Sequence, residues 1–236
     1  MNSWQDDYLG ELVSSKDEQS LFLSIAKIAA GLDFDYCAYG MRMPLPISNP
    51  AVVMFNNYPS AWQAEYKRRN YLAEDPTVKH ALRSLAPLIW SAQVFADSPD
   101  LWGDAQDIGL RVGLAHPSRD SQNIVGLLTL ARSTEALSPA EIKDKQFKLA
   151  WLTQTTHMGM AKHLAPKFIP SLEMPLSSRE IEILRWTAEG KTASEIAEIL
   201  RISARTVNFH VNHAVSKLGV ANKTAATVQA AILGLL

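Results

Sequence analysis

The stretch LSSREIEILRWTAEGKTASEIAEILRISARTVNFHVNHAVSKLGVANKTAA, residues 176–226, decides how the C-terminal part of this chain folds. Its apolar-periodic runs are preceded by residues that favour helix N-caps, namely Ser177, Thr192, Ser203 and Asn222. Ser177 and Thr192 are each followed three residues later by glutamate, which is the capping-box pattern. The stretch therefore predicts four short helices.

The second and third of these helices follow one another closely, since the second ends near Arg201 and Ser203 already caps the third. So short a joint is typical of a helix-turn-helix. On the third helix, apolar residues recur at steps of three and four, which predicts one stripe facing a small core. The stripe consists of Val207, Val211, Ala214 and Leu218.

The opposite face of the third helix is polar, which suits a DNA groove. Asn208 and Asn212 lie one helical turn apart on it, and an asparagine amide can bond the N6 and N7 edge of adenine. No acidic residue follows Glu198, so the basic residues there can meet phosphates. These are Arg201, Arg205, Lys217 and Lys223. Charge alone fits a solvated helix surface equally well, and the helix geometry is what favours DNA.

Three prolines, Pro166, Pro170 and Pro175, predict a linker over residues 166–175. The linker would divide a front domain, residues 1–165, from a C-terminal domain, residues 176–236. The front domain is long enough to bury a core of its own.

The front domain mixes helical and strand periodicities. Strands are expected over residues 34–43, 51–56, 110–117 and 124–131, and helices over residues 2–14, 17–31, 59–69 and 74–85. Ser138, Pro139 and Glu141 predict the start of a long helix that ends near Leu164. The fold class is then an α+β front domain, an α-β-α sandwich, joined to a small all-α four-helix helix-turn-helix domain.

Several classes of protein are not expected. The sequence has no G-x-S-x-G, H-E-x-x-H or phosphate-loop motif, so it is not expected to be an enzyme, and no receiver-type acidic cluster is apparent. His210 and His213 have a metal-ligand spacing but lack partner ligands, so no metal and no cofactor are expected. Without a signal peptide or an apolar span, and with Cys37 as its one cysteine, the chain is expected to be cytoplasmic and not to meet a membrane.

The segment from residue 58 to residue 90 has the composition of a small-molecule pocket. Large aromatic side chains exclude water, while a carboxylate and a hydroxyl orient a guest. These candidates are Tyr58, Trp62, Tyr66, Asp75, Thr77 and Trp90. Tyr58, Trp62 and Tyr66 recur at four-residue steps, so a helix that begins near Pro59 can place them on one face. The same residues would also serve as core aromatics with hydrogen-bonded polar tips.

Residues 176–226 resemble the DNA-binding domain of LuxR-type transcription regulators along nearly their whole length. The resemblance implies base reading by Asn208, Phe209 and Asn212, a dimer through the last helix, and a two-fold symmetric double-stranded operator. The DNA-binding residues expected are Thr192, Arg205, Thr206, Asn208, Phe209, Asn212 and Lys217, with Lys217 facing phosphate.

The stretches NYPSAWQAEYKRRNYLAEDPTVKHAL, PLIW, GLRVGLAHP and GLLTLARS resemble the autoinducer-binding domain of the same regulators. The resemblance implies an N-acyl homoserine lactone ligand. Trp62 would donate to the lactone carbonyl, Asp75 would accept from the ligand amide, and Tyr58 with Thr129 would bond the acyl carbonyl. Trp90 would wall the lactone ring, and Tyr66, Val78, Leu110 and Val125 would line the acyl chain. The further candidates are Ala38, Gly40, Val52, Met54, Phe95, Trp102, Ala105 and Leu127.

The expected function is therefore a quorum-sensing transcription regulator that binds DNA as a homodimer, with RNA polymerase as a candidate partner. Its closest alternative is a LuxR-type regulator for a different small molecule. Members of the family differ around Thr77, Ala115 and Arg42, near the place of a 3-oxo or 3-hydroxy group, so acyl length and oxidation stay open.

Overall fold

The computed structural model describes residue 10, residues 15–133 and residues 135–236. The helix expected over residues 2–14 therefore lies, apart from Gly10, outside the described residues. The chain divides into two compact units. The first comprises residues 1–42, 52–120 and 124–163, and the second comprises residues 43–51, 121–123 and 164–236.

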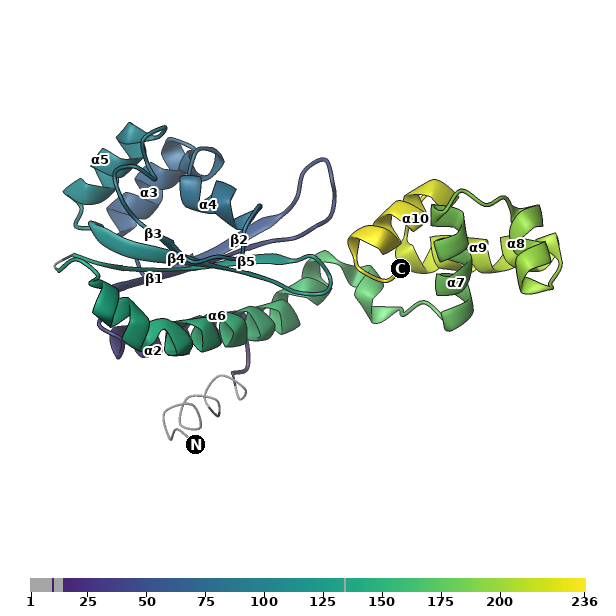
Figure 1. Ribbon diagram of the computed structural model, residues 1–236, viewed down its shortest axis with the longest axis horizontal. Helices are drawn as coiled ribbons and strands as arrows, with labels where there is room; N and C mark the ends of the chain where they lie inside the picture. The colour runs from purple at the N-terminus through teal and green to yellow at the C-terminus, as the bar shows by residue number, and fades with distance from the viewer. Residues whose placement is uncertain (1–9, 11–14, 134) are drawn as a thin grey trace. The chain divides into compact units, whose positions relative to one another are not determined.

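The first unit is a three-layer α-β-α sandwich, as the sequence predicts. Its antiparallel sheet has the order β2-β1-β5-β4-β3. The strands are β1 (Tyr36–Arg42), β2 (Val52–Asn56), β3 (Leu88–Ile89), β4 (Val112–Arg119) and β5 (Val125–Arg132). Helices α3 (Ser60–Arg68), α4 (Pro76–Ala81) and α5 (Pro99–Asp107) cover one face, and α2 (Glu18–Ala30) and α6 (Pro139–Phe168) cover the other (Figure 1).

Local sequence signals account for most of these boundaries. Asp17 caps α2 by accepting a hydrogen bond from the Ser20 N–H at 2.7 Å, and Ser138 accepts from the Glu141 N–H at 3.1 Å at the start of α6. The helix expected over residues 74–85 is shorter, because Asp75 caps it and Pro76 begins it. Strand β3 and helix α5 were not expected, although Ser98 followed by Pro99 is a helix-start signal.

Helix α6 continues beyond Leu164, where the sequence predicts its end, and includes Pro166. Proline lacks an N–H and so removes one hydrogen bond, but near a C-terminus the turn can still close. The Ile169 N–H donates to the Ala165 carbonyl at 2.8 Å, which carries the turn past the proline. Helical structure thus enters the expected linker, whose boundaries stay a prediction.

Alternation along β1 assigns the two faces of the sheet. Cys37, Tyr39 and Met41 are fully buried, and the Tyr39 hydroxyl lies 2.9 Å from His157 Nδ1 of α6. This places the odd-numbered residues toward α6, since strand side chains alternate. Ala38, Gly40 and Arg42 consequently face the layer formed by α3, α4 and α5.

The second unit contains the four predicted helices, α7 (Ser178–Ala188), α8 (Ala193–Leu200), α9 (Ala204–Leu218) and α10 (Lys223–Ile232). Ser177 and Thr192 form capping boxes with Glu180 and Glu195. Arg201 and Gly219 end α8 and α9 in the left-handed region, with φ of 53° and 67°. The stripe predicted on α9 is buried, which confirms the helix-turn-helix arrangement.

Within the described residues, no helix is both long and apolar enough to cross a membrane.

Candidate functional site

A cavity of about 870 Å³ lies between the sheet and the layer of α3, α4 and α5. This volume falls within the usual range of small-molecule pockets, roughly 300–1,000 Å³. Every ligand residue expected from the sequence lines it. These are Ala38, Gly40, Val52, Met54, Tyr58, Trp62, Tyr66, Asp75, Thr77, Val78, Trp90, Phe95, Trp102, Ala105, Leu110, Val125, Leu127 and Thr129.

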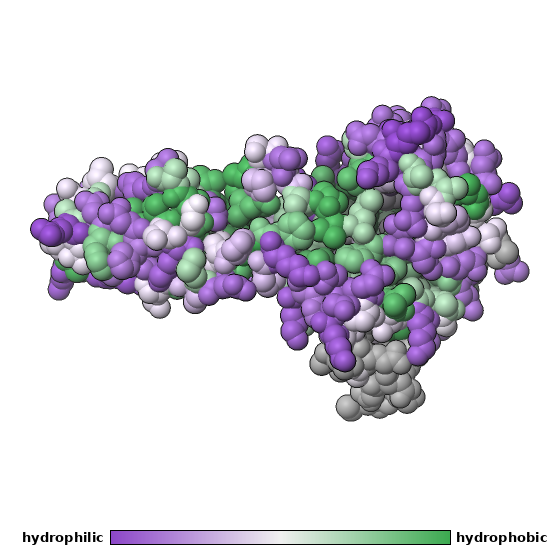
Figure 2. All heavy atoms as spheres, turned by 180° about the vertical axis from the view of Figure 1, so that it is seen from behind, coloured by the Kyte–Doolittle hydropathy of each residue, from purple (hydrophilic) through white to green (hydrophobic). Residues whose placement is uncertain are grey.

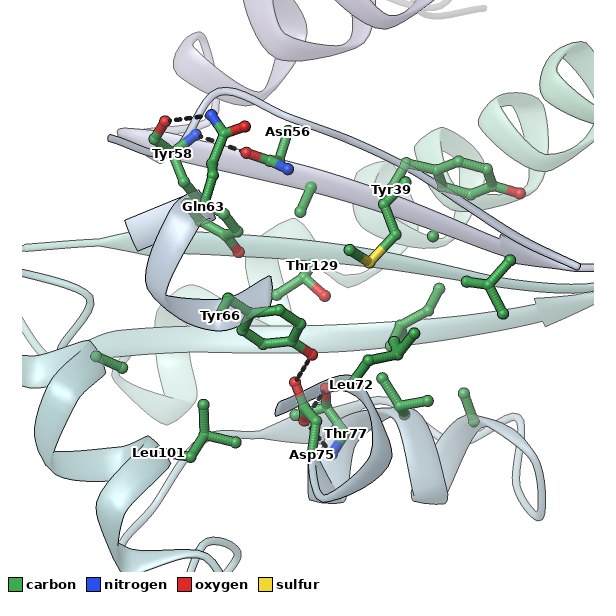
Figure 3. Close-up of a pocket in the computed structure, with 18 of the residues that line it drawn as sticks. Tyr39, Asn56, Tyr58, Gln63, Tyr66, Leu72, Asp75, Thr77, Leu101 and Thr129 are labelled. Atoms are coloured by element: carbon green, nitrogen blue, oxygen red, sulfur yellow. Dashed lines mark hydrogen bonds between the residues drawn. The ribbon is translucent and has the colours of Figure 1, made fainter. Parts of the chain in front are cut away.

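The carboxylate of Asp75 is the polar centre of the helical wall (Figure 3). Its Oδ1 accepts hydrogen bonds from the Thr77 N–H at 2.8 Å and the Thr77 hydroxyl at 2.7 Å. Its Oδ2 accepts from the Tyr66 hydroxyl at 2.9 Å. Tyr66, expected only to line an acyl chain, therefore also orients the carboxylate. Because an ionised carboxylate accepts about four hydrogen bonds, Asp75 keeps capacity for one more donor.

Two hydroxyls stand in the cavity without a protein partner. Neither the Tyr58 nor the Thr129 hydroxyl is hydrogen-bonded to any residue that the structure describes. Burial, followed by the charge of Asp75, raises the pKa of Tyr66, and burial likewise raises the pKa of Tyr58. Both phenols stay protonated at neutral pH and can donate.

Aromatic rings surround this polar centre. Trp62, which is 5% exposed, packs edge-on against Tyr66 with ring centroids 5.8 Å apart. Trp90 packs edge-on against Phe95 at 5.9 Å, and Phe95 stacks on Trp102 at 4.7 Å. The indole Nε1 of Trp90 is buried and has no hydrogen-bond partner among the described residues. The rings exclude water from the polar groups, and Trp90 adds a donor that is not yet satisfied.

Sheet register orders the second wall of the cavity into rows. Asn56, Ala38 and Thr129 form one row, Met54, Gly40 and Leu127 the next, and Val52, Arg42 and Val125 the third. The rows change from polar to apolar along the strands except for Arg42, and for Arg119 of β4, which pairs with Val125.

The register also separates positions that the sequence groups together. Arg42 lies two rows from Thr129. Ala115 pairs with Thr129 in the sheet but does not line the cavity. The positions Ala115 and Arg42 are therefore not neighbours in the sheet.

Several lining residues were missed by the sequence reasoning. Leu101 belongs to α5, whose helical periodicity is short, and Leu72 lies in a 3₁₀ turn. Asn56 and Gln63 sit at the polar end, where Asn56 Oδ1 accepts from the Tyr58 N–H and Gln63 Nε2 donates to the Tyr58 carbonyl (Figure 3). Only the Ser98–Pro99 pair could have signalled α5.

In the second unit, α9 presents the polar face expected for DNA. Arg205, Asn208 and Asn212 are exposed, and Phe209 is 53% exposed. The Phe209 ring lies against His213, with centroids 4.1 Å apart. These side chains come from a single helix, so one groove can meet all of them.

The other expected DNA residues make contacts within the unit. Thr192 caps α8, and the Thr206 hydroxyl lies 2.8 Å from the Ser203 hydroxyl at the start of α9. Lys217 Nζ donates to Glu180 Oε2 at 2.8 Å, and Glu180 is only 4% exposed. This ion pair joins α7 to α9, which favours a role for Lys217 in the fold in place of the expected phosphate contact.

Comparison with known proteins agrees with this geometry. Residues 17–160 match the family model of the autoinducer binding domain, and residues 174–230 match that of the bacterial regulatory proteins of the luxR family. The chain belongs to the LuxR family of quorum-sensing transcription regulators. As such it is a regulator with a ligand domain and a DNA-binding domain, and not an enzyme.

Relatives match this LuxR-family chain end to end. It is 47% identical to the transcriptional activator protein AnoR of Acinetobacter nosocomialis, with 100% of both chains covered. It is 37% identical to the HTH-type quorum-sensing regulator RhlR of Pseudomonas aeruginosa, covering 99% of this chain and 96% of RhlR.

A crystal structure of Escherichia coli SdiA superposes with a TM-score of 0.84 at 34% identity, covering 99% and 98% of the two chains. A structure of SdiA in complex with octanoyl-rac-glycerol superposes with a TM-score of 0.83 at 34% identity, covering 99% and 95%.

Proposed function

We propose that this LuxR-family protein binds an N-acyl homoserine lactone in the cavity of its first unit and, as a homodimer, a two-fold symmetric operator through α9. The observation that carries the proposal is the pairing of one oriented carboxylate with unpartnered donors in an aromatic cavity. Asp75 is held by Tyr66 and Thr77, while the Tyr58 and Thr129 hydroxyls face the same space.

The chemistry of such a ligand fits these groups one to one. Its amide N–H is a donor, which Asp75 accepts, and leaving that donor buried and unpaired would cost about 1–3 kcal/mol. Its acyl carbonyl is an acceptor for the Tyr58 and Thr129 hydroxyls. Its lactone carbonyl can accept from the indole of Trp62, and the unsatisfied Trp90 Nε1 lies within the same cavity wall.

Dimerisation is supported by apolar side chains on the surface. Hydrophobic residues gather in patches between hydrophilic ones (Figure 2). On α6, Phe147 is 79% and Met158 is 64% exposed, and on α10, Val228 is 43% exposed between the exposed Thr224 and Ala231. Helix surfaces of this kind are stabilised when a second copy covers them. We propose that the exposed residues Thr224, Val228 and Ala231 of α10 form the interface of the operator-bound dimer.

The regulatory mechanism follows from linkage. A ligand that binds only the folded first unit stabilises it as ligand concentration rises, and a dimer fixes the spacing of two α9 helices on DNA. Ligand binding, dimerisation and operator binding are then coupled equilibria. Because bacterial DNA and RNA polymerase lie in the cytoplasm, we place the function there, with RNA polymerase as a further partner.

The test is to measure operator affinity and dimer content of the full-length protein with and without acyl homoserine lactones at fixed salt. We expect lactone to increase both. If lactone changes neither the dimer content nor the affinity for operator, the proposal fails.

A second candidate ligand is a neutral acyl glycerol. The related SdiA structure contains octanoyl-rac-glycerol, which offers carbonyl and hydroxyl groups but no amide donor. The two candidates make different demands on Asp75, because the lactone amide N–H can only donate to it, whereas a glycerol hydroxyl can donate or accept. Replacing Asp75 by asparagine should therefore weaken lactone binding far more than acyl glycerol binding.

A further inference from the structure

Arg42 stands in an unexpected place on the cavity wall. It is the last residue of β1 and shares its row with Val52 and Val125, so its neighbours in the sheet are apolar. It lines the cavity and is half-buried. No hydrogen bond or ion pair joins its guanidinium to another residue in the described part of the chain. An unpartnered guanidinium between two valines lacks any evident role in the fold.

The position of Arg42 along the cavity can be related to a bound acyl chain. Ala38, in the row of Thr129, and Arg42 are four residues apart in one strand, which corresponds to about 14 Å at ~3.4 Å per residue. An extended alkyl chain advances about 1.25 Å per carbon, given a C–C bond of ~1.5 Å. An acyl chain whose carbonyl is held by Thr129 therefore reaches Arg42 after about eleven carbons.

The cavity is open to solvent near this row. Val52, Met54 and Leu82 line it, and they are 40%, 48% and 39% exposed. A methyl-ended chain that enters this region strips water from the guanidinium and offers no acceptor in return. A chain that ends in a carboxylate offers a charge-assisted hydrogen bond instead. The other lining cations, Lys67 of α3 and Lys79 of α4, belong to the helical layer and are exposed. Arg119 of β4 extends the row of Arg42 through Val125, but it lies outside the lining and donates to the Leu82 carbonyl at 3.2 Å.

We propose that the guanidinium of Arg42 selects the far end of the acyl chain of the ligand. It admits chains that stop short of it and long chains whose end carries an anionic oxygen, and it disfavours long chains that end in a methyl group. This inference rests on the proposed function, because it presupposes an acyl ligand whose carbonyl is bound beside Thr129.

The test uses the full-length protein and three probes: hexanoyl homoserine lactone, dodecanoyl homoserine lactone, and a dodecanoyl homoserine lactone that carries a carboxylate at the end of its chain. The measured quantity is the ratio of the dissociation constants of the two long probes. We expect Arg42→Leu to shift this ratio by about tenfold in favour of the methyl-ended chain. The affinity for the hexanoyl probe should change less than about twofold, since that chain ends before Arg42.

Three further variants make the result specific. Arg42→Gln removes the charge while keeping a polar side chain, and should shift the ratio in the same direction as leucine. Arg42→Lys retains the charge and should retain the preference. Arg83→Leu is the matched control, because Arg83 is exposed just after α4 and lies outside the cavity lining.

The outcomes separate the two proposals. If the hexanoyl probe binds but neither Arg42→Leu nor Arg42→Gln shifts the ratio relative to wild type, the role of Arg42 is refuted and the proposed function stands. If none of the three probes binds the wild-type protein, the proposed function fails and the inference about Arg42 fails with it.

Discussion

At the scale of single residues, the proposed recognition of a lactone depends on Asp75. Its two oxygens are already oriented by Thr77 and Tyr66, so a ligand amide would meet a carboxylate that does not have to reorganise. An asparagine keeps the shape but replaces one acceptor by a donor.

We expect Asp75→Asn to raise the dissociation constant for acyl lactone at least about tenfold, which corresponds to about 1.4 kcal/mol. Isothermal titration of the full-length protein measures it. Tyr66→Phe is the control, because it removes the orienting hydroxyl but leaves the carboxylate, and we expect a smaller loss. An unchanged affinity in the asparagine variant would remove Asp75 from the site.

Asn208 and Asn212 are the residues of α9 best placed to read bases, because both amides are exposed one turn apart. We expect Asn208→Ala and Asn212→Ala to relax base preference, each by about 1–3 kcal/mol at the position it reads. Selection of binding sites from random duplexes measures the preference. Ser216→Ala, on the same polar face but a turn further along, should leave it intact, and a preference unaltered in both asparagine variants would contradict base reading.

At the scale of secondary-structure elements, the pair between Lys217 and Glu180 fixes α9 against α7. Burial alone would raise the pKa of Glu180, but the hydrogen bonds from Lys217 and the Ser177 N–H outweigh it, so the pKa lies below its ordinary 4.5. A carboxyl whose pKa is lowered on folding stabilises the fold above its unfolded pKa. That contribution is lost as the pH falls through the lowered value.

We expect Lys217→Met to destabilise α7 and α9 by about 2 kcal/mol at pH 7, somewhat less than a fully buried pair because Lys217 is 31% exposed. Hydrogen exchange of these helices measures the loss, which should shrink as the pH falls below the ordinary carboxyl pKa of 4.5 and Glu180 becomes protonated. In Lys217→Met the salt dependence of DNA binding should change little. Arg205→Ala should lower the slope of log affinity against log salt concentration by about one. A lower slope for the Lys217 variant would instead assign Lys217 to phosphate.

Gly126 of β5 lies directly against His157 of α6. A Cβ atom there would overlap His157 Nδ1, Ser118 Oγ and the Tyr39 hydroxyl oxygen. Because these groups are buried, they cannot move aside into solvent. We expect Gly126→Ala to lower the free energy of unfolding of the first unit by about 1–3 kcal/mol. Denaturant unfolding measures it. Gly40→Ala is the control, since its Cβ would meet only Met54 at 3.9 Å, and equal losses in both variants would contradict the argument.

At the scale of the whole molecule, the proposed function gives the two units different ligands, acyl lactone for the first and DNA for the second. A ligand at about one hundred times its dissociation constant stabilises the unit that binds it by about 2.7 kcal/mol. We expect acyl lactone to slow hydrogen exchange in the sheet and in α3 and α4. In α7 to α10, hydrogen exchange should slow only through dimer formation. Melting temperatures measured with C4 to C12 lactones should rank the chain lengths. The absence of protection in the first unit would contradict binding there.

Local signals in the sequence determined most of the second unit. Each of its helices begins at a capping residue that is visible in the sequence, and the stripe Val207, Val211, Ala214 and Leu218 gives the buried face of α9. Such features involve residues within one or two turns of each other, so periodicity and capping chemistry suffice to predict them. The layer order of the first unit also followed from the alternation of strand and helix patterns.

The sequence by itself also named eighteen residues that line the cavity, but largely through a resemblance to a family, because no local pattern tells a pocket aromatic from a core aromatic. Tertiary structure alone decided which groups meet: Tyr66 with Asp75, Lys217 with Glu180 across 37 residues, and Arg42 with two valines. Contacts of this kind depend on sheet register and on how helices pack. One side chain then acquires its role from neighbours far away in the chain, and local sequence carries no record of them.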